Sequence, residues 1–82
     1  MTIQELTDTA AELILGRMQQ NQPVSIKTID SWIQAGMTMP GNRARSIACA
    51  AALQDLVARG AIRRQDGGYA PGVTEGYVLV VQ

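Results

Sequence analysis

The chain has 82 residues, a formal net charge of zero, one cysteine and no histidine, and its length fits a single domain covering residues 1–82. This composition offers no ligand set for zinc, and the scattered acidic residues form no catalytic pair, so we expect neither an enzyme nor a bound metal or cofactor. No apolar run approaches the roughly 20 residues of a membrane span, and the start lacks the basic residues of a signal peptide, so we expect a cytoplasmic protein without a membrane partner.

The first predicted element is a helix at about residues 3–20. Thr2, followed three residues later by Glu5, forms a capping box, in which each side chain accepts a hydrogen bond from a backbone N–H group at the helix start. Apolar residues recur from Ile3 to Met18 at the spacing of one helix face, which predicts that this face packs on a core. A polar run that ends in proline closes the helix.

A second helix is predicted at residues 26–36, with Ser25 as its N-cap. Val24 before the cap and Ile29 inside the helix are placed to form a hydrophobic staple. The stretch that begins at Val24 fits a short strand equally well, and the sequence leaves both interpretations open. Gly36 suits a left-handed C-cap, so the helix is expected to end there.

A third helix is predicted at about residues 42–59, because an apolar stripe that includes Leu53 and Leu56 follows one face and Gly60 stops it. A helical wheel places a second set of residues opposite Leu53, on a face that we expect to be exposed. This alanine face consists of Ala44, Ala48, Ala51, Asp55 and Ala58. Alanine favours helices in general, but small side chains also allow a nucleic-acid groove or a partner helix to approach closely, and both interpretations stay open.

Three short strands are predicted after this helix, at about residues 61–65, 69–70 and 77–81. Ile62 is expected to face inward, and the Asp-Gly-Gly sequence at residues 66–68 supplies a tight turn. The last strand is apolar enough either to be covered on both faces or to pair with another chain. The second alternative predicts a homodimer.

Two segments carry a resemblance to a known family. In "LQDLVARGAIRR" a leucine repeat leads through Gly60 to an aliphatic residue, and "DGGYAPG" follows as a glycine-rich turn. Together with three preceding helices, this pattern resembles the winged helix-turn-helix family over roughly residues 3–70. The resemblance implies an α+β fold with three helices followed by a small antiparallel β-hairpin or sheet. It also implies a transcriptional regulator that contacts duplex DNA through the third helix and the wing.

The resemblance assigns DNA contacts to several parts of this unit. The start of the third helix would meet base edges, Lys27 would hold a phosphate, and the wing would touch the backbone or the minor groove. The assigned residues are Lys27, Asn42, Arg43, Arg45, Ser46, Arg63, Arg64 and Tyr69. Tyr69 fits a cross-strand packing residue as well, and each arginine taken alone fits an ordinary solvated charge.

The charge pattern leaves a second function open. All seven basic residues lie between Arg17 and Arg64 together with only two acids, so this segment carries a charge of +5. The whole chain is nevertheless neutral, whereas DNA-binding proteins usually concentrate basic residues. The alternative is a winged-helix-like adaptor or inhibitor that binds a protein through the alanine face and the apolar C-terminal strand.

Overall fold

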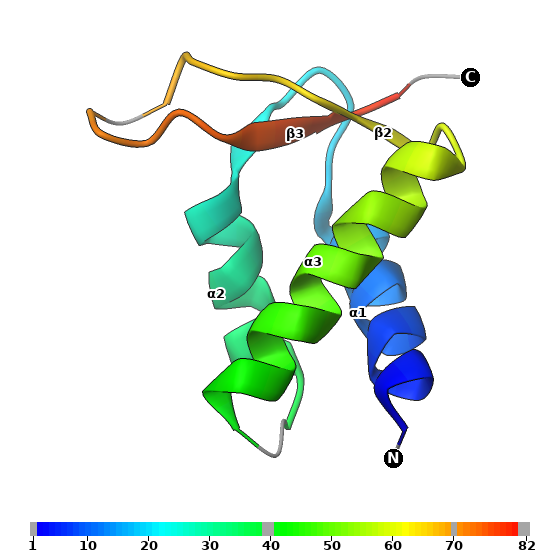
Figure 1. The fold of residues 1–82 in the computed structure, drawn as a ribbon. Coiled ribbons are helices and arrows are strands. Elements are labelled where there is room, and N and C mark those ends of the chain that lie inside the picture. The colour runs from blue at the N-terminus through cyan, green and yellow to red at the C-terminus, as the bar shows by residue number, and fades with distance from the viewer. Residues whose placement is uncertain (1, 39–40, 70, 81–82) are drawn as a thin grey trace.

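The computed structural model describes residues 2–38, 41–69 and 71–80, and these residues form three helices and three strands (Figure 1). In chain order the elements are α1 (Ile3–Arg17), β1 (Val24–Ser25), α2 (Ile26–Gly36), α3 (Asn42–Ala58), β2 (Ile62–Arg64) and β3 (Gly76–Leu79). The helices pack together and the sheet lies across one end of them. The predicted α+β class is confirmed, and the arrangement is consistent with a winged-helix layout. None of the helices in these ranges is long and apolar enough to cross a membrane.

The start of α1 agrees with the prediction. The Thr2 hydroxyl oxygen accepts a hydrogen bond from the Glu5 backbone N–H over 3.1 Å, and the Glu5 carboxylate accepts one from the Thr2 N–H over 3.3 Å. This reciprocal pair confirms the capping box. The helix ends at Arg17 instead of residue 20, because the backbone of Met18 is extended. Met18 is still buried, so the apolar pattern continues beyond the helix itself.

Both open interpretations of the start of α2 hold. Ser25 pairs with Gly76 as part of strand β1, and its hydroxyl oxygen accepts a hydrogen bond from the Thr28 backbone N–H over 3.3 Å as the N-cap. At the other end, the prediction of a left-handed cap at Gly36 is wrong, because this glycine is the last helical residue and has no positive φ. Its small size serves a close approach instead, since a Cβ atom there would lie 2.9 Å from a methyl carbon of Leu13.

The end of α3 is a Schellman motif. Gly60 has a φ of 76°, and its N–H donates to the Val57 carbonyl over 3.0 Å. The N–H of Ala61 donates to the Leu56 carbonyl over 3.0 Å, which satisfies a second free carbonyl at the helix end. A positive φ is favourable only for glycine, so Gly60 both stops α3 and directs the chain into β2, as predicted.

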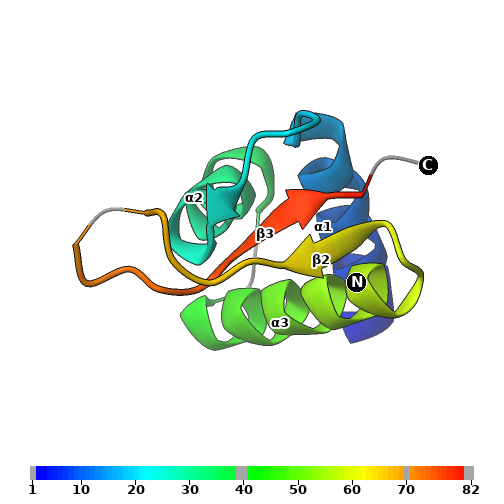
Figure 2. The same ribbon diagram turned by 90° about the horizontal axis from the view of Figure 1, so that it is seen from above.

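The sheet is antiparallel and has the strand order β1-β3-β2 (Figure 2). Strand β3 is therefore central, with Tyr77 opposite Val24 of β1 and Leu79 opposite Ile62 of β2. Tyr77 and Val78 are buried. The prediction that this strand offers an unpaired edge to another chain is wrong, because both of its edges are already hydrogen-bonded within the sheet. The other alternative, coverage within the chain's own fold, is the one observed.

The hairpin is less regular than predicted. Strand β2 is shorter than residues 61–65, and Tyr69 lies in a bend instead of a strand. The remainder of the predicted strand at 69–70, and residue 81 at the end of the predicted last strand, lie outside the described residues. The connection from β2 to β3 is thus a long wing loop, residues 65–75, and not a tight two-residue turn.

The core joins all three helices to the sheet. Its largest fully buried side chains are Leu6, Ile14, Ile29, Ile33, Leu56 and Ile62. Helices α1 and α3 make the most extensive helix contact in the fold, and Ala10 of α1 and Ala52 of α3 are both fully buried. The distance between packed helices depends on the side chains at the contact, so these alanines let the two helices approach closely.

Candidate nucleic-acid interface

The outward side of α3 is a continuous ridge. Its members follow one another at intervals of three, one, three and four residues, so they lie on one helix face, and all of them are exposed. We define the α3 ridge as Arg43, Ser46, Ile47, Ala50 and Gln54. In Figure 2, α3 runs along one side of the molecule. The wing extends beyond the end at which α3 begins, on the side where α2 also begins.

The alanine face predicted from the helical wheel does not exist as one exposed surface. Ala48 is fully buried, and Ala44 and Ala51 are only partly exposed, although Asp55 and Ala58 reach solvent. The helical-wheel prediction places Leu53 at the centre of the buried side. The buried residues of α3 are Ala48, Cys49, Ala52, Leu53 and Leu56, which place Leu53 at one edge of the buried sector. The exposed alanine nearest the middle of the helix is therefore Ala50.

Arg45 is held between two helices. Its Nε atom donates to the Asp30 carboxylate of α2 over 3.2 Å, and its terminal nitrogen donates to the Asn42 side-chain oxygen over 3.0 Å. Only 19% of the Arg45 side chain is exposed. Of the residues assigned to the start of α3, Arg45 thus links this end of the helix to α2, and Asn42 bonds to Arg45 within α3. Arg43 and Ser46 point outward on the α3 ridge.

The two wing arginines lie on opposite faces of the sheet. Arg64 pairs with Tyr77 in the ladder and Arg63 pairs with Val78, and alternate residues of a strand face opposite ways. The Arg64 guanidinium lies 2.8 Å from the Asp66 carboxylate and 4.0 Å from that of Glu75. The hydrogen bond to Asp66 is the main cause that raises the pKa of Arg64 above its usual value. Arg63 is exposed, and no ion pair joins it to another residue of the described segments.

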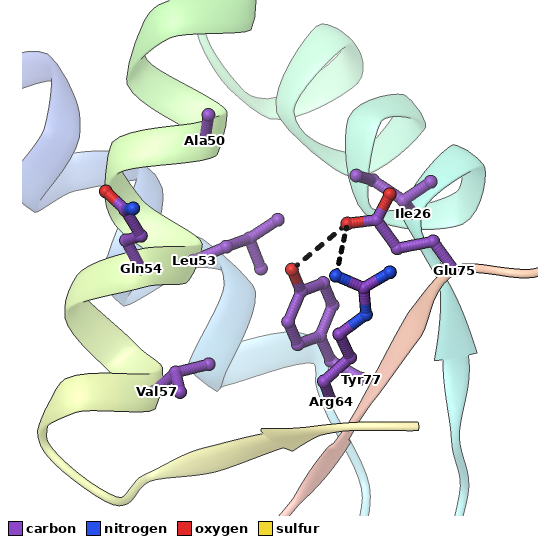
Figure 3. A pocket seen from close by; sticks show the side chains of 8 residues that line it. All are labelled: Ile26, Ala50, Leu53, Gln54, Val57, Arg64, Glu75 and Tyr77. Carbon is purple, nitrogen blue, oxygen red and sulfur yellow. Dashed lines mark hydrogen bonds and ion pairs between the residues drawn. The ribbon is translucent and has the colours of Figure 1, made fainter. Parts of the chain in front are cut away.

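A groove separates α3 from the sheet (Figure 3). It has a volume of about 430 Å³, and its walls come from Ile26, Ala50, Leu53, Gln54, Val57, Arg64, Glu75 and Tyr77. The Tyr77 hydroxyl donates to the Glu75 carboxylate over 3.3 Å, and the Arg64 side chain points toward the same carboxylate. Burial, followed by the negative charge of Glu75, raises the pKa of Tyr77.

A second hollow adjoins the groove. It is lined by Ile26, Lys27, Asp30, Ser46, Cys49 and Ala50. Ile26 and Ala50 line both cavities, so the two hollows are neighbours beside α3. Lys27 and Ser46, which were assigned to DNA contact from the resemblance, are brought together here. No local pattern in the sequence indicates these two hollows, because their walls come from four elements, α2, α3, β2 and β3.

Cys49 lines this second hollow, and we expect its thiol to be unreactive. Its side chain is buried, and burial raises the pKa of its thiol to about 11. The charge of Asp30 acts in the same direction and that of Arg45 acts against it. A thiol that stays protonated is a poor nucleophile and a poor metal ligand. Across the described residues, no group of three acidic or cysteine side chains is placed to hold a metal ion.

Tyr69 is used inside the wing. Its hydroxyl donates to the Gln65 carbonyl over 3.0 Å, and its ring lies against Gly76. Burial, with the nearby charge of Asp66, raises its pKa. Of the two interpretations, packing describes what this side chain does in the structure. It folds the wing loop back onto the start of β3.

Charge is segregated in space as well as along the chain. The surface of α1 carries Glu5, Asp8, Glu12 and Arg17, which amounts to two net negative charges. The region formed by α2, the start of α3 and the wing carries two net positive charges, from five bases and three acids. Asp55 and Arg59 form an ion pair at the end of α3 and cancel each other. Figure 2 shows the wing and α1 at opposite ends of the molecule, so the neutral total hides a basic side and an acidic side.

Comparison with protein families, curated proteins and solved structures found no significant match to this chain.

Proposed function

We propose that this protein binds duplex DNA as a transcriptional regulator, with the α3 ridge in the major groove and the wing against the backbone. The observation that carries the proposal is the group of exposed cations on the basic side. Lys27, Arg43 and Arg63 are exposed, and none of them has an acidic partner among the described residues. Lys27 and Arg43 flank the exposed side of α3, Arg63 lies on β2 at the base of the wing, and exposed cations of this kind suit contacts to phosphates, which position a protein on DNA.

The proposal implies binding of modest strength. Each phosphate that is neutralised releases counterions, and the logarithm of the affinity falls with the logarithm of the salt concentration by about 0.9 per contact. Contacts from Lys27, Arg43 and Arg63 correspond to a slope of about −3. Arg64 and Arg45 add little to this term, because each is already paired with a carboxylate.

A protein-binding adaptor or inhibitor is the second candidate. Ile47 and Val57 are large apolar side chains that are 46% and 42% exposed on α3, and this favours a protein partner. The two surfaces predicted for this function, the alanine face and the apolar C-terminal strand, are mostly used for packing and pairing within the fold. Ala48 of the alanine face is buried, and β3 is the central strand. We therefore place DNA binding first.

The test is fluorescence anisotropy with a mixed-sequence duplex of about 30 base pairs, at about 50 mM and about 200 mM salt. We expect the double variant Arg43→Ala/Arg63→Ala to bind at least about tenfold more weakly than wild type and to show a flatter salt slope. The matched control, Arg17→Ala/Arg59→Ala, loses the same two charges away from the proposed interface. If both double variants lose the same amount of DNA affinity, or if the wild-type affinity does not change with salt concentration, the proposal is overturned.

A further inference from the structure

The α3 ridge contains an apolar centre that the core does not explain. Ile47 is 46% exposed, and Ala50, three residues further along, is also exposed. Ser46 lies beside them, and Arg43 lies one turn before Ile47. Neither Ile47 nor Ala50 belongs to the cluster of buried side chains. These two apolar residues therefore face outward between polar neighbours.

The surroundings of this apolar centre are cationic. Lys27 shares a hollow with Ser46 and Ala50, and Arg43 is at the opposite end of the short run. The acid that lines the same hollow, Asp30, is paired with Arg45. No carboxylate lies on the ridge itself. The ligand that matches such a surface carries apolar groups between negative charges.

Thymine in the major groove of duplex DNA has this chemistry. Its C5-methyl group is the apolar feature of that groove, and phosphates line both of its edges. Building on the DNA binding proposed above, we infer that Ile47 and Ala50 read thymine methyl groups, while Lys27 and Arg43 contact phosphates at the edges of the groove. From Ile47 to Ala50 the helix rises about 4.5 Å, which corresponds to about one base-pair step. A preferred site thus has thymine at one or both of two adjacent base pairs.

The experiment begins with a pool of duplexes that have a randomised central segment, from which the full chain selects its preferred site. The selected duplex is then prepared again with uracil in place of thymine, which removes the methyl groups and leaves the base pairs and phosphates unchanged. We expect wild type to bind the uracil duplex about fourfold more weakly for each methyl group contacted, equivalent to about 0.8 kcal/mol. In Ile47→Ala we expect a smaller difference in affinity between the thymine and uracil duplexes, because the contacts of Ile47 with methyl groups are lost.

Val57→Ala is the matched control, because Val57 is similarly exposed on α3 but lies towards its other end. This variant is expected to keep the full thymine preference. A thermal melt of both variants checks that they remain folded. A selected site without thymine, equal wild-type affinity for the two duplexes, or a full preference in Ile47→Ala would each overturn the inference while DNA binding itself stands. If the protein selects no duplex at any salt concentration, the proposals of DNA binding and of thymine reading are both wrong. The apolar residues of the α3 ridge would then favour a protein partner.

Discussion

The ring of Tyr69 lies so close to Gly76 that a Cβ atom at position 76 would overlap the tyrosine hydroxyl oxygen and the ring carbon that carries it. Gly76 is the first residue of β3, and Tyr69 belongs to the wing loop. The absent side chain at 76 therefore lets the wing fold back onto the sheet. The Tyr69 hydroxyl then reaches the Gln65 carbonyl.

This contact predicts a specific coupling. Gly76→Ala forces the Tyr69 ring out of place, and we expect it to lower the free energy of unfolding by about 1–3 kcal/mol, the usual range for overpacking. Once Tyr69→Ala has removed the ring, the Gly76→Ala substitution should cost much less. Chemical denaturation of the two single variants and the double variant measures this difference. Additive losses would mean that Tyr69 is not the group that alanine meets.

The pairing of Arg45 with Asp30 predicts different roles for two neighbouring arginines. Arg45→Ala removes a partly buried ion pair between α3 and α2, so we expect it to lower the free energy of unfolding by about 1 kcal/mol. Arg43→Ala should leave stability nearly unchanged, because Arg43 is exposed and has no acidic partner in the described parts of the chain. For affinity to mixed-sequence DNA we expect the opposite order, in which Arg43→Ala lowers the affinity more than Arg45→Ala does. Denaturation and anisotropy of the same two proteins check both halves of this prediction.

Ala50, an exposed alanine of the α3 ridge, offers a site where an added charge should block binding. Ala50→Glu places a carboxylate on an exposed helical position, and glutamate is a good helix former, so the melting temperature should change little. DNA affinity should fall at least about tenfold at low salt and recover partly at high salt, because salt screens the repulsion from phosphates.

Gly16→Glu on α1 is the matched control for this charge. A Cβ atom at Gly16 meets nothing within 4 Å, and this glycine has no positive φ, so the substitution adds the same charge without strain. Loss of affinity in both variants would indicate a general charge effect and not a blocked interface.

The buried thiol predicts a dependence of stability on pH. The pKa of Cys49 is raised from its ordinary value of 9.0 to about 11, so the native state holds the thiol proton more tightly than the unfolded state. The resulting contribution to stability is complete below about pH 9 and is lost as the pH rises towards about 11. We expect the free energy of unfolding to fall over this interval more steeply in wild type than in Cys49→Ala.

This comparison isolates the thiol. Tyr69 and Tyr77, whose pKa values are also raised, titrate in both proteins, and Cys49 is the smallest of the causes that raise the pKa of Tyr77, so most of their contribution is common to both curves. Parallel curves for the two proteins would show that the thiol titrates normally in the folded state.

Much of the fold could be predicted from signals that act over a few residues. The pair Thr2 and Glu5 fixes the start of α1, and Gly60 fixes the end of α3, because each depends on local backbone geometry. The end of α1 was placed too late for a physical reason. Apolar spacing reports which side chains are buried, and Met18 stays buried after its backbone has left the helix.

The candidate site was harder to predict, because it depends on contacts between distant segments. Arg45 and Asp30 are fifteen residues apart, so their pairing has no local signal. The wheel for α3 failed because an alanine carries little information about burial, and Ala48 proved to be fully buried. The position of β3 between two strands follows from the pairing of Val24 with Tyr77, which the sequence left open.

The most direct measurement of DNA binding is a titration of the ¹⁵N-labelled protein with duplex DNA, followed residue by residue through its backbone amide signals. We predict shifts in the ridge-bearing half of α3 (residues 42–54), at Lys27 and in the wing (residues 63–75), with α1 (Ile3–Arg17) unchanged. The shifted set should revert as salt is raised, because the proposed contacts are mainly to phosphates. Shifts confined to α1, or no shifts at low salt and high DNA concentration, would contradict the account.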